Sequence, residues 1–128
     1  MRRPCLFLGN AMIQSPEDLA QFAESLTKAW SRETSSLWSS DDPARGQCGV
    51  TSLVVQDLFG GQILKTPLQQ GPHFYNLIAG RRIDFTSDQF ADPIDYEDLP
   101  SHREEAMSDT NPGQYRALRE RLGLPVND

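Results

Sequence analysis

Residues 46–61 read GQCGVTSLVVQDLFGG, and a buried helix is predicted for residues 50–59 of this stretch, with residues 46–49 leading into it. Most apolar side chains of this stretch share one helical face, but Val55 and Phe59 lie off it, so the helix is apolar over most of its circumference. Such a helix is typically surrounded by protein on all sides. The β-branched run also suits a strand, and periodicity alone does not separate the two. Gly60-Gly61, at the position of a helix C-cap, favours the helix.

The elements around this helix indicate an α+β fold, because helices and antiparallel strands occupy separate parts of the chain. An amphipathic helix of about 15 residues is predicted to begin at Ser15, which approximates a capping box with Asp18. The remaining predicted elements are a Ser-rich loop (31–46), strands (62–66, 73–79 and 81–86), an irregular acidic surface segment (88–110) and a last helix capped by Asn111 with Pro112 following.

Length and composition indicate a single globular domain, residues 1–128, in which residues 1–14 are an irregular N-terminal segment that precedes the first helix. Apolar residues make up 38%, and no apolar run approaches the ~18 residues that a membrane span needs. The net charge is −6 and the basic residues are scattered, which disfavours a nucleic-acid-binding groove. We therefore expect neither nucleic acid nor a membrane as partner.

The cysteine count favours a reduced, cytoplasmic protein. Two cysteines, Cys5 and Cys48, are too few for a disulfide scaffold, although a single bridge between them is conceivable. Arg2-Arg3 followed by an apolar stretch faintly imitates a signal peptide, but polar residues interrupt it and no small-residue cleavage site follows. Cys5, Cys48 and the two histidines lack metal-ligand spacing, so no metal or other cofactor is predicted.

Cys48 lies where a Gly-containing loop enters the buried helix. The unpaired N–H groups and the positive dipole end of a helix N-terminus stabilise an anion, so we expect this position to lower the pKa of the thiol. The plainer interpretation is that Cys48 is a small buried apolar side chain, as free cysteines usually are.

His73 and Asp84 complete a possible catalytic set. If Ala79-Gly80 is a two-residue hairpin loop, Tyr75 faces Asp84, and His73 becomes the diagonal neighbour of Asp84, about 7–8 Å away at the backbone. A loop shifted by one residue or enlarged to three separates them. In the alternative without catalysis, Asp84 pairs with Arg82 or with a nearby backbone group.

In the order Cys48, His73 and Asp84, the three side chains are suited to act as nucleophile, base and orienting carboxylate. The backbone N–H of Cys48 would be one oxyanion donor. The other candidates for oxyanion donation or substrate contact are Gln47, Thr34, Ser36, Trp38 and Tyr75.

Two resemblances add to this interpretation. His73-Phe74-Tyr75 and Asp84-Phe85-Thr86 resemble the His-x-aromatic and Asp-x-Thr elements of transglutaminase-like proteins, which belong to the broader papain-like class. The chain more closely resembles the small bacterial YunG-like family, on features spread over residues 30–90: Trp30-Ser31, Thr34-Ser35, Trp38, Gly46-Gln47-Cys48, Val54-Val55-Gln56-Asp57, Gly60-Gly61, His73-Phe74-Tyr75-Asn76, Asp84-Phe85-Thr86 and Gln89-Phe90.

The resemblance to the papain-like class implies a core in which a helix with cysteine at its N-terminus packs on a small antiparallel sheet. The sequence departs from the papain-like class in two respects. The glutamine that often supplies an oxyanion donor lies several residues before the cysteine in papain-like proteases, whereas Gln47 is adjacent to it here. The chain is also too short for a second lobe. We therefore expect a cysteine-dependent amide hydrolase, deamidase or acyl transferase with a small-molecule or peptide-like substrate. The alternative is a non-catalytic binding domain that keeps this frame.

Overall fold

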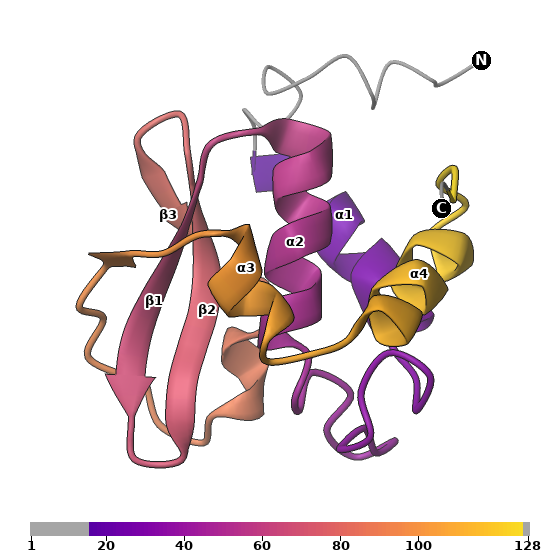
Figure 1. The fold of residues 1–128 in the computed structure, drawn as a ribbon, viewed down its shortest axis with the longest axis horizontal. Helices are drawn as coiled ribbons and strands as arrows, with labels where there is room; N and C mark the ends of the chain where they lie inside the picture. Colours follow the sequence, from indigo (N-terminus) through magenta and orange to yellow (C-terminus); the bar gives the residue numbers. More distant parts are fainter. Residues whose placement is uncertain (1–15, 127–128) are drawn as a thin grey trace.

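The predicted buried helix is α2 (Cys48–Phe59), and it stands at the centre of the computed structural model, which describes residues 16–126 (Figure 1). The N-terminal segment of residues 1–14, the Ser15 cap and Cys5 lie outside the described residues. Nine of the twelve α2 residues are buried, which confirms the prediction drawn from its apolar circumference.

Three groups of core side chains meet on α2, each on a different side of the helix. Val50 and Val54 pack with α1 and α4, Val55 and Phe59 pack with the β2–β3 side of the sheet, and Leu53 packs with β1, β2 and α3. Full burial of one such aliphatic or aromatic side chain contributes about 1.5–3 kcal/mol. The position of α2, and of the cysteine that begins it, is therefore held by contacts with almost every other element.

The sheet has four antiparallel strands in the order β3-β2-β1-β4, and α2 lies along one side of it (Figure 1). Its strands are β1 (Gln62–Leu68), β2 (Gly71–Ile78), β3 (Arg81–Ile83) and β4 (Leu99–Pro100). Phe74 and Ile78 of β2 join the core beside α2, and the Asn76 side-chain amide donates to the Ser52 carbonyl of that helix (3.1 Å).

The hairpin register predicted for β2 and β3 is confirmed. Ile78 pairs with Arg81, and Ala79 and Gly80 form the two-residue loop with φ of 53° and 77°. Positive φ at both loop residues is the conformation of a type I′ turn, whose twist matches that of the flanking strands. Because this register excludes the shifted loop, Asp84 follows β3 on the side of the ladder that brings it to His73.

Two longer helices cover the side of α2 away from the sheet: α1 (Pro16–Ala29) and α4 (Pro112–Arg121) (Figure 1). The predicted cap of α4 is present, with the Asn111 side chain accepting from the Gln114 N–H at 2.8 Å and Pro112 in the first turn. The Trp30 indole at the end of α1 donates to the Thr51 hydroxyl of α2 at 2.9 Å, which ties these two helices together.

The segment predicted to be irregular, residues 88–110, is partly regular. It contains β4, the short helix α3 (Arg103–Met107) and part of the 3-10 turn η3 (Ser87–Gln89). His102 is exposed, and its side chain caps α3 by accepting from the Glu105 N–H.

The predicted strand ends also need correction. The strand β1 continues through Pro67, which pairs with Pro72, and β2 begins at Gly71, so Gly71-Pro72 does not interrupt the ladder. The strand β3 ends at Ile83, three residues before the predicted end, because the chain turns at Asp84–Thr86.

No helix within residues 16–126 combines the length and the apolar character needed to cross a lipid bilayer.

Candidate functional site

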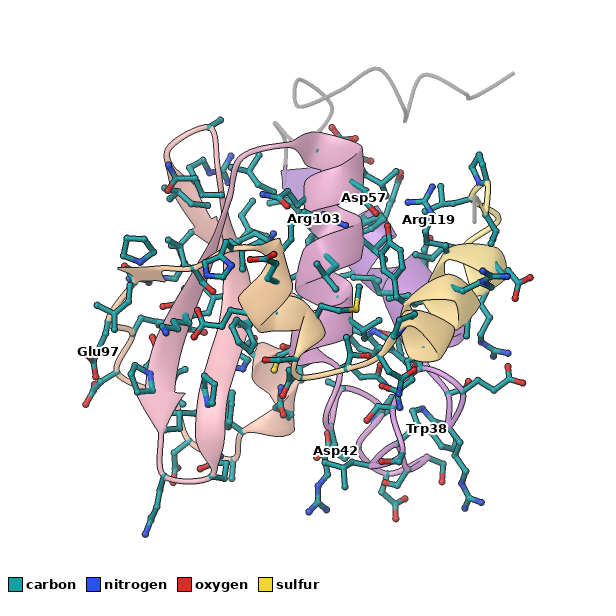
Figure 2. The ribbon with its side chains drawn as sticks, in the orientation of Figure 1. Trp38, Asp42, Asp57, Glu97, Arg103 and Arg119 are labelled. Atoms are coloured by element: carbon teal, nitrogen blue, oxygen red, sulfur yellow. The ribbon has the colours of Figure 1, made fainter. Side chains whose placement is uncertain are left out.

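Cys48 and His73 line one cavity of about 570 Å³ at the N-terminal end of α2. The loop before the helix contributes Asp42 and Arg45, the β1–β2 turn contributes Gln70, and η3 with the residue after it contributes Gln89 and Phe90. Figure 2 shows Asp42 and Trp38 in the loop next to this end of the helix. Three segments far apart in the sequence therefore enclose the cysteine and the histidine.

His73 is held by Asp84 in a buried hydrogen-bonded pair. The His73 Nε2 and the Asp84 Oδ2 lie 2.7 Å apart, and the two side chains are 2% and 5% exposed. Asp84 has further donors, because Oδ1 accepts from the Thr86 N–H and hydroxyl and Oδ2 accepts from the Tyr96 hydroxyl at 2.7 Å. A buried carboxylate is tolerated when it is hydrogen-bonded in this way. The predicted contact of His73 with Asp84 is observed, whereas Arg82 pairs with Asp98 instead.

The bond to Asp84 uses Nε2, which leaves Nδ1 as the ring nitrogen of His73 for a further partner. The imidazole is fixed on both sides by aromatic rings, with the Phe90 ring edge-on at 4.8 Å and the Tyr75 ring stacked at 5.6 Å between centroids. Its orientation is therefore determined by packing as well as by the carboxylate.

The immediate partner of the Cys48 thiol is Asp109, which the sequence did not indicate. The Asp109 Oδ2 lies 3.4 Å from Cys48 Sγ and accepts from the Gly49 N–H at 3.1 Å. Asp109 comes from the turn between α3 and α4, sixty-one residues from the cysteine, and no local motif marks it.

The expectation of a lowered thiol pKa at this helix N-terminus is wrong for the structure as it stands. Burial of Cys48, which is 8% exposed, raises the pKa of its thiol, and the charge of Asp109 raises it further, whereas a hydrogen bond from the Phe74 backbone acts in the opposite direction. Burial also raises the pKa of the Asp109 carboxyl, partly offset by its bonds to Cys48 and Gly49. The resting cysteine is therefore a neutral thiol that donates to a carboxylate.

The other predicted contact residues lie outside the lining of this cavity. Gln47 is fully buried with its Oε1 accepting from the Thr34 hydroxyl at 2.8 Å, and its Nε2 has no hydrogen-bond partner among the described residues. Trp38 packs against the core group of α1 and α4, and the Tyr75 hydroxyl contacts Thr66 and Asp98. Ser36 lines a neighbouring cavity of about 280 Å³ that also borders Asp109.

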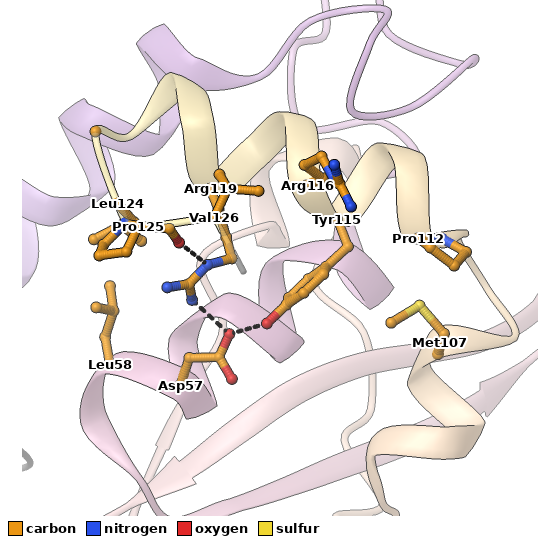
Figure 3. A pocket seen from close by; sticks show the side chains of 11 residues that line it. Asp57, Leu58, Met107, Pro112, Tyr115, Arg116, Arg119, Leu124, Pro125 and Val126 are labelled. Atoms are coloured by element: carbon orange, nitrogen blue, oxygen red, sulfur yellow. Dashed lines mark hydrogen bonds and ion pairs between the residues drawn. The ribbon is translucent and has the colours of Figure 1, made fainter. Parts of the chain in front are cut away.

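A larger cavity of about 1040 Å³ lies between the C-terminal half of α2 and α4 (Figure 3). Its central carboxylate, Asp57, accepts from Arg119 at 2.8 Å and from the Tyr115 hydroxyl, and it also pairs with Arg103 at 2.9 Å. Those groups satisfy one another and hold α3 and α4 to α2. None of the described residues that line this cavity is a cysteine, serine or histidine, so we place the candidate site at Cys48.

Within residues 16–126, no group of three or more His, Cys, Asp and Glu side chains has the arrangement of a metal site.

Comparison with known proteins identifies the family. The family model described as "YunG protein" matches residues 18–125. The curated "Uncharacterized protein YunG" of Bacillus subtilis (strain 168) is 53% identical over 102 residues, which cover 80% of this chain and 89% of that protein. No solved structure shows a significant match. The chain therefore belongs to the YunG family, as its tryptophan, cysteine and histidine motifs predicted.

Proposed function

We propose that this protein is a cysteine-dependent amide hydrolase, deamidase or acyl transferase. The observation that carries the proposal is that Cys48 and His73 line one cavity while Asp84 holds the far ring nitrogen of His73. This arrangement supplies a nucleophile, a base with a free Nδ1, and a carboxylate that fixes the tautomer and stabilises the imidazolium.

The proposed reaction starts from the neutral thiol. His73 Nδ1 takes the thiol proton as Cys48 Sγ attacks the carbonyl carbon of an amide, and the oxyanion is met by the backbone N–H of Cys48. The imidazolium returns its proton to the leaving amine as the C–N bond breaks, which leaves a thioester on Cys48. Water or a second amine, deprotonated by His73, then releases the acyl group and restores the thiol.

The arrangement of elements supports a papain-like or transglutaminase-like core as part of this proposal. A buried helix starts with the cysteine, and the histidine and carboxylate come from an adjacent antiparallel hairpin. In the papain-like class these three roles fall on a helix N-terminus and two neighbouring strands in the same order along the chain. The cavity of about 570 Å³ suits a small molecule or a single side chain better than a long peptide.

The test measures formation of a thioester with an activated ester. The protein, in a Cys5→Ser background that leaves Cys48 as the only thiol, is mixed with p-nitrophenyl acetate. Nitrophenolate release is followed by absorbance, and the acetyl group on the protein is detected by intact mass. We expect one acetyl group per chain, none in Cys48→Ala, and a rate at least about 100-fold lower in His73→Ala, because general-base catalysis contributes about 10²–10⁴-fold. His102→Asn is the matched control, since it alters the exposed histidine and keeps a side chain able to cap α3.

The neutral, carboxylate-bound state of Cys48 favours a second candidate function, a binding domain without catalysis. Equal acylation rates for the unaltered protein, His73→Ala and His102→Asn would support this second candidate, because a thiol that reacts without His73 is not part of a catalytic set. A selective loss in His73→Ala would exclude it.

A further inference from the structure

We propose that Asp109 is a positioning residue that holds Cys48 in its resting, protonated state, so that the nucleophile becomes reactive only when this carboxylate moves away. The inference rests on the proposed role of Cys48 as nucleophile. It assigns to Asp109 a role outside the set of Cys48, His73 and Asp84.

The geometry gives one carboxylate oxygen two donors at the site of attack. Asp109 Oδ2 accepts from the Cys48 thiol and from the Gly49 N–H, the next backbone donor after that of the cysteine. An N–H at a helix N-terminus beside a nucleophile is a natural place for the carbonyl oxygen of a bound substrate. The carboxylate of Asp109 occupies that donor in the structure, so a substrate oxygen has to replace it there.

Gly49, the residue after the cysteine, leaves room for the contact with Asp109 because it has no side chain. A Cβ at Gly49 would lie 2.6 Å from Asp109 Oδ2 and 2.8 Å from the Ala106 carbonyl oxygen, both closer than real side chains allow. Only glycine lets the α3–α4 turn approach the first turn of α2 this closely. The turn is also held in place, because the Asp109 N–H donates to the Ala106 carbonyl at 3.1 Å.

Asp109 also borders two cavities. It lines the cavity of Cys48 and His73 and the neighbouring cavity of about 280 Å³, which share Leu37, Gly46 and Asp109. The two cavities therefore adjoin at these three residues. Withdrawal of the Asp109 side chain from Cys48 would therefore open the N-terminus of α2 toward a ligand that enters from either side.

The charges around Cys48 favour the neutral thiol on balance. Asp109 contributes most, because it is the nearest charge and touches the sulfur, and Asp84 acts in the same direction from a greater distance. The other titratable or charged groups that face this region, from the loop before α2, from β2 and from α4, are Asp42, Arg45, His73 and Tyr115. Removal of the Asp109 charge should therefore lower the pKa of the thiol.

The experiment measures alkylation of Cys48 by iodoacetamide as a function of pH, using intact mass in a Cys5→Ser background that leaves Cys48 as the only thiol of the chain. For the unaltered protein we expect the midpoint to lie above the ordinary cysteine value of about 8.5, because both burial and Asp109 oppose the thiolate. In Asp109→Asn, which removes the charge and keeps an acceptor for the Gly49 N–H, we expect the midpoint to fall by at least one pH unit. The alkylation rate at pH 7.5 should rise about tenfold with it.

Asp109→Glu and Asp42→Asn are the controls. Asp109→Glu retains a carboxylate and should keep the midpoint high, whereas general loosening of the turn would lower it in both Asp109 variants. Asp42→Asn neutralises another carboxylate of the cavity and should leave the midpoint where it is. If Asp109→Asn does not fold, Asp109→Ser replaces it, because a hydroxyl also accepts from Gly49.

An unchanged or higher midpoint in the neutral variant would overturn the role of Asp109 and leave it as a cap of α2. This result is separable from failure of the proposed function. Alkylation by iodoacetamide does not require His73, so a lower midpoint in Asp109→Asn supports the role of Asp109 even if His73→Ala is acylated at the normal rate. Likewise, loss of acylation in His73→Ala supports the proposed function even if the midpoint does not change in Asp109→Asn.

Discussion

Two buried polar side chains of the candidate site region, Asp84 and Gln47, differ in how completely their polar atoms are hydrogen-bonded. Asp84 has donors on both oxygens, from His73, Thr86 and Tyr96. Gln47, directly before the cysteine, has a partner only on its oxygen, and its Nε2 is buried without one among the described residues. Full satisfaction makes a buried carboxylate stable, whereas an unpaired buried amide lowers stability.

This difference predicts the effect of replacing Gln47. In Gln47→Met, of similar volume, loss of the bond from Thr34 costs about 0.5–1.5 kcal/mol, while removal of the unpaired Nε2 recovers about 1–3 kcal/mol. We therefore expect the free energy of unfolding in urea to stay within about 1 kcal/mol of the unaltered value or to increase. Thr34→Val is the control, and it should destabilise the protein, because it leaves both the Ser31 N–H and Gln47 without a partner.

A fall of more than about 2 kcal/mol in Gln47→Met would show that the amide is satisfied in solution. Unchanged stability together with loss of acylation would instead identify Gln47 as an oxyanion donor.

The elements differ in how far the sequence could predict them. The hairpin β2–β3 was predictable, because a two-residue loop leaves few registers, and Ala79-Gly80 adopts the positive φ values of that loop. The helix α3 and the strand β4 were not, since five and two residues carry no periodic signal and both are held by contacts with distant elements. Asp109 escaped prediction for the same reason, because its position beside Cys48 depends on the packing of α3 on α2.

The close approach of the α3–α4 turn to α2 makes a prediction about Gly49. Alanine normally stabilises a helix relative to glycine by about 1 kcal/mol. In Gly49→Ala the new Cβ would meet the Ala106 carbonyl oxygen at 2.8 Å, and this atom belongs to the backbone and does not rotate away. We expect a net loss of about 1–3 kcal/mol in the free energy of unfolding, because the turn has to shift.

Gly113→Ala is the matched control, a glycine in the first turn of α4. Its added Cβ would lie 3.2 Å from the Asn111 side-chain oxygen only. We expect a much smaller change than in Gly49→Ala, since that side chain adjusts more easily than backbone. Equal losses in the two variants would contradict the close packing of the turn on α2.

At the scale of the whole molecule, the two ends of α2 make different kinds of contact. The N-terminal end presents Cys48 to the cavity, and the C-terminal end carries Asp57, which binds Arg103 of α3 and Arg119 of α4 (Figure 2). Asp109 lies in the turn between these two helices. Asp57 therefore joins α2 to both of the helices that flank the turn carrying Asp109.

This connection predicts that Asp57→Asn will both lower the free energy of unfolding and increase the reactivity of the Cys48 thiol. Loss of two ion pairs and of the strong acceptor for Tyr115 should lower the free energy of unfolding by about 1–3 kcal/mol, more than an isolated surface pair because three partners share one carboxylate. Cys48 should also react faster with iodoacetamide at pH 7.5, because α3 and α4 hold Asp109 less firmly.

Glu33→Gln, which breaks the exposed pair with Arg121 (3.4 Å), is the control and should change stability by less than about 0.5 kcal/mol. A destabilised Asp57→Asn protein with unchanged Cys48 reactivity would show that the turn carrying Asp109 is held independently of the two helices beside it.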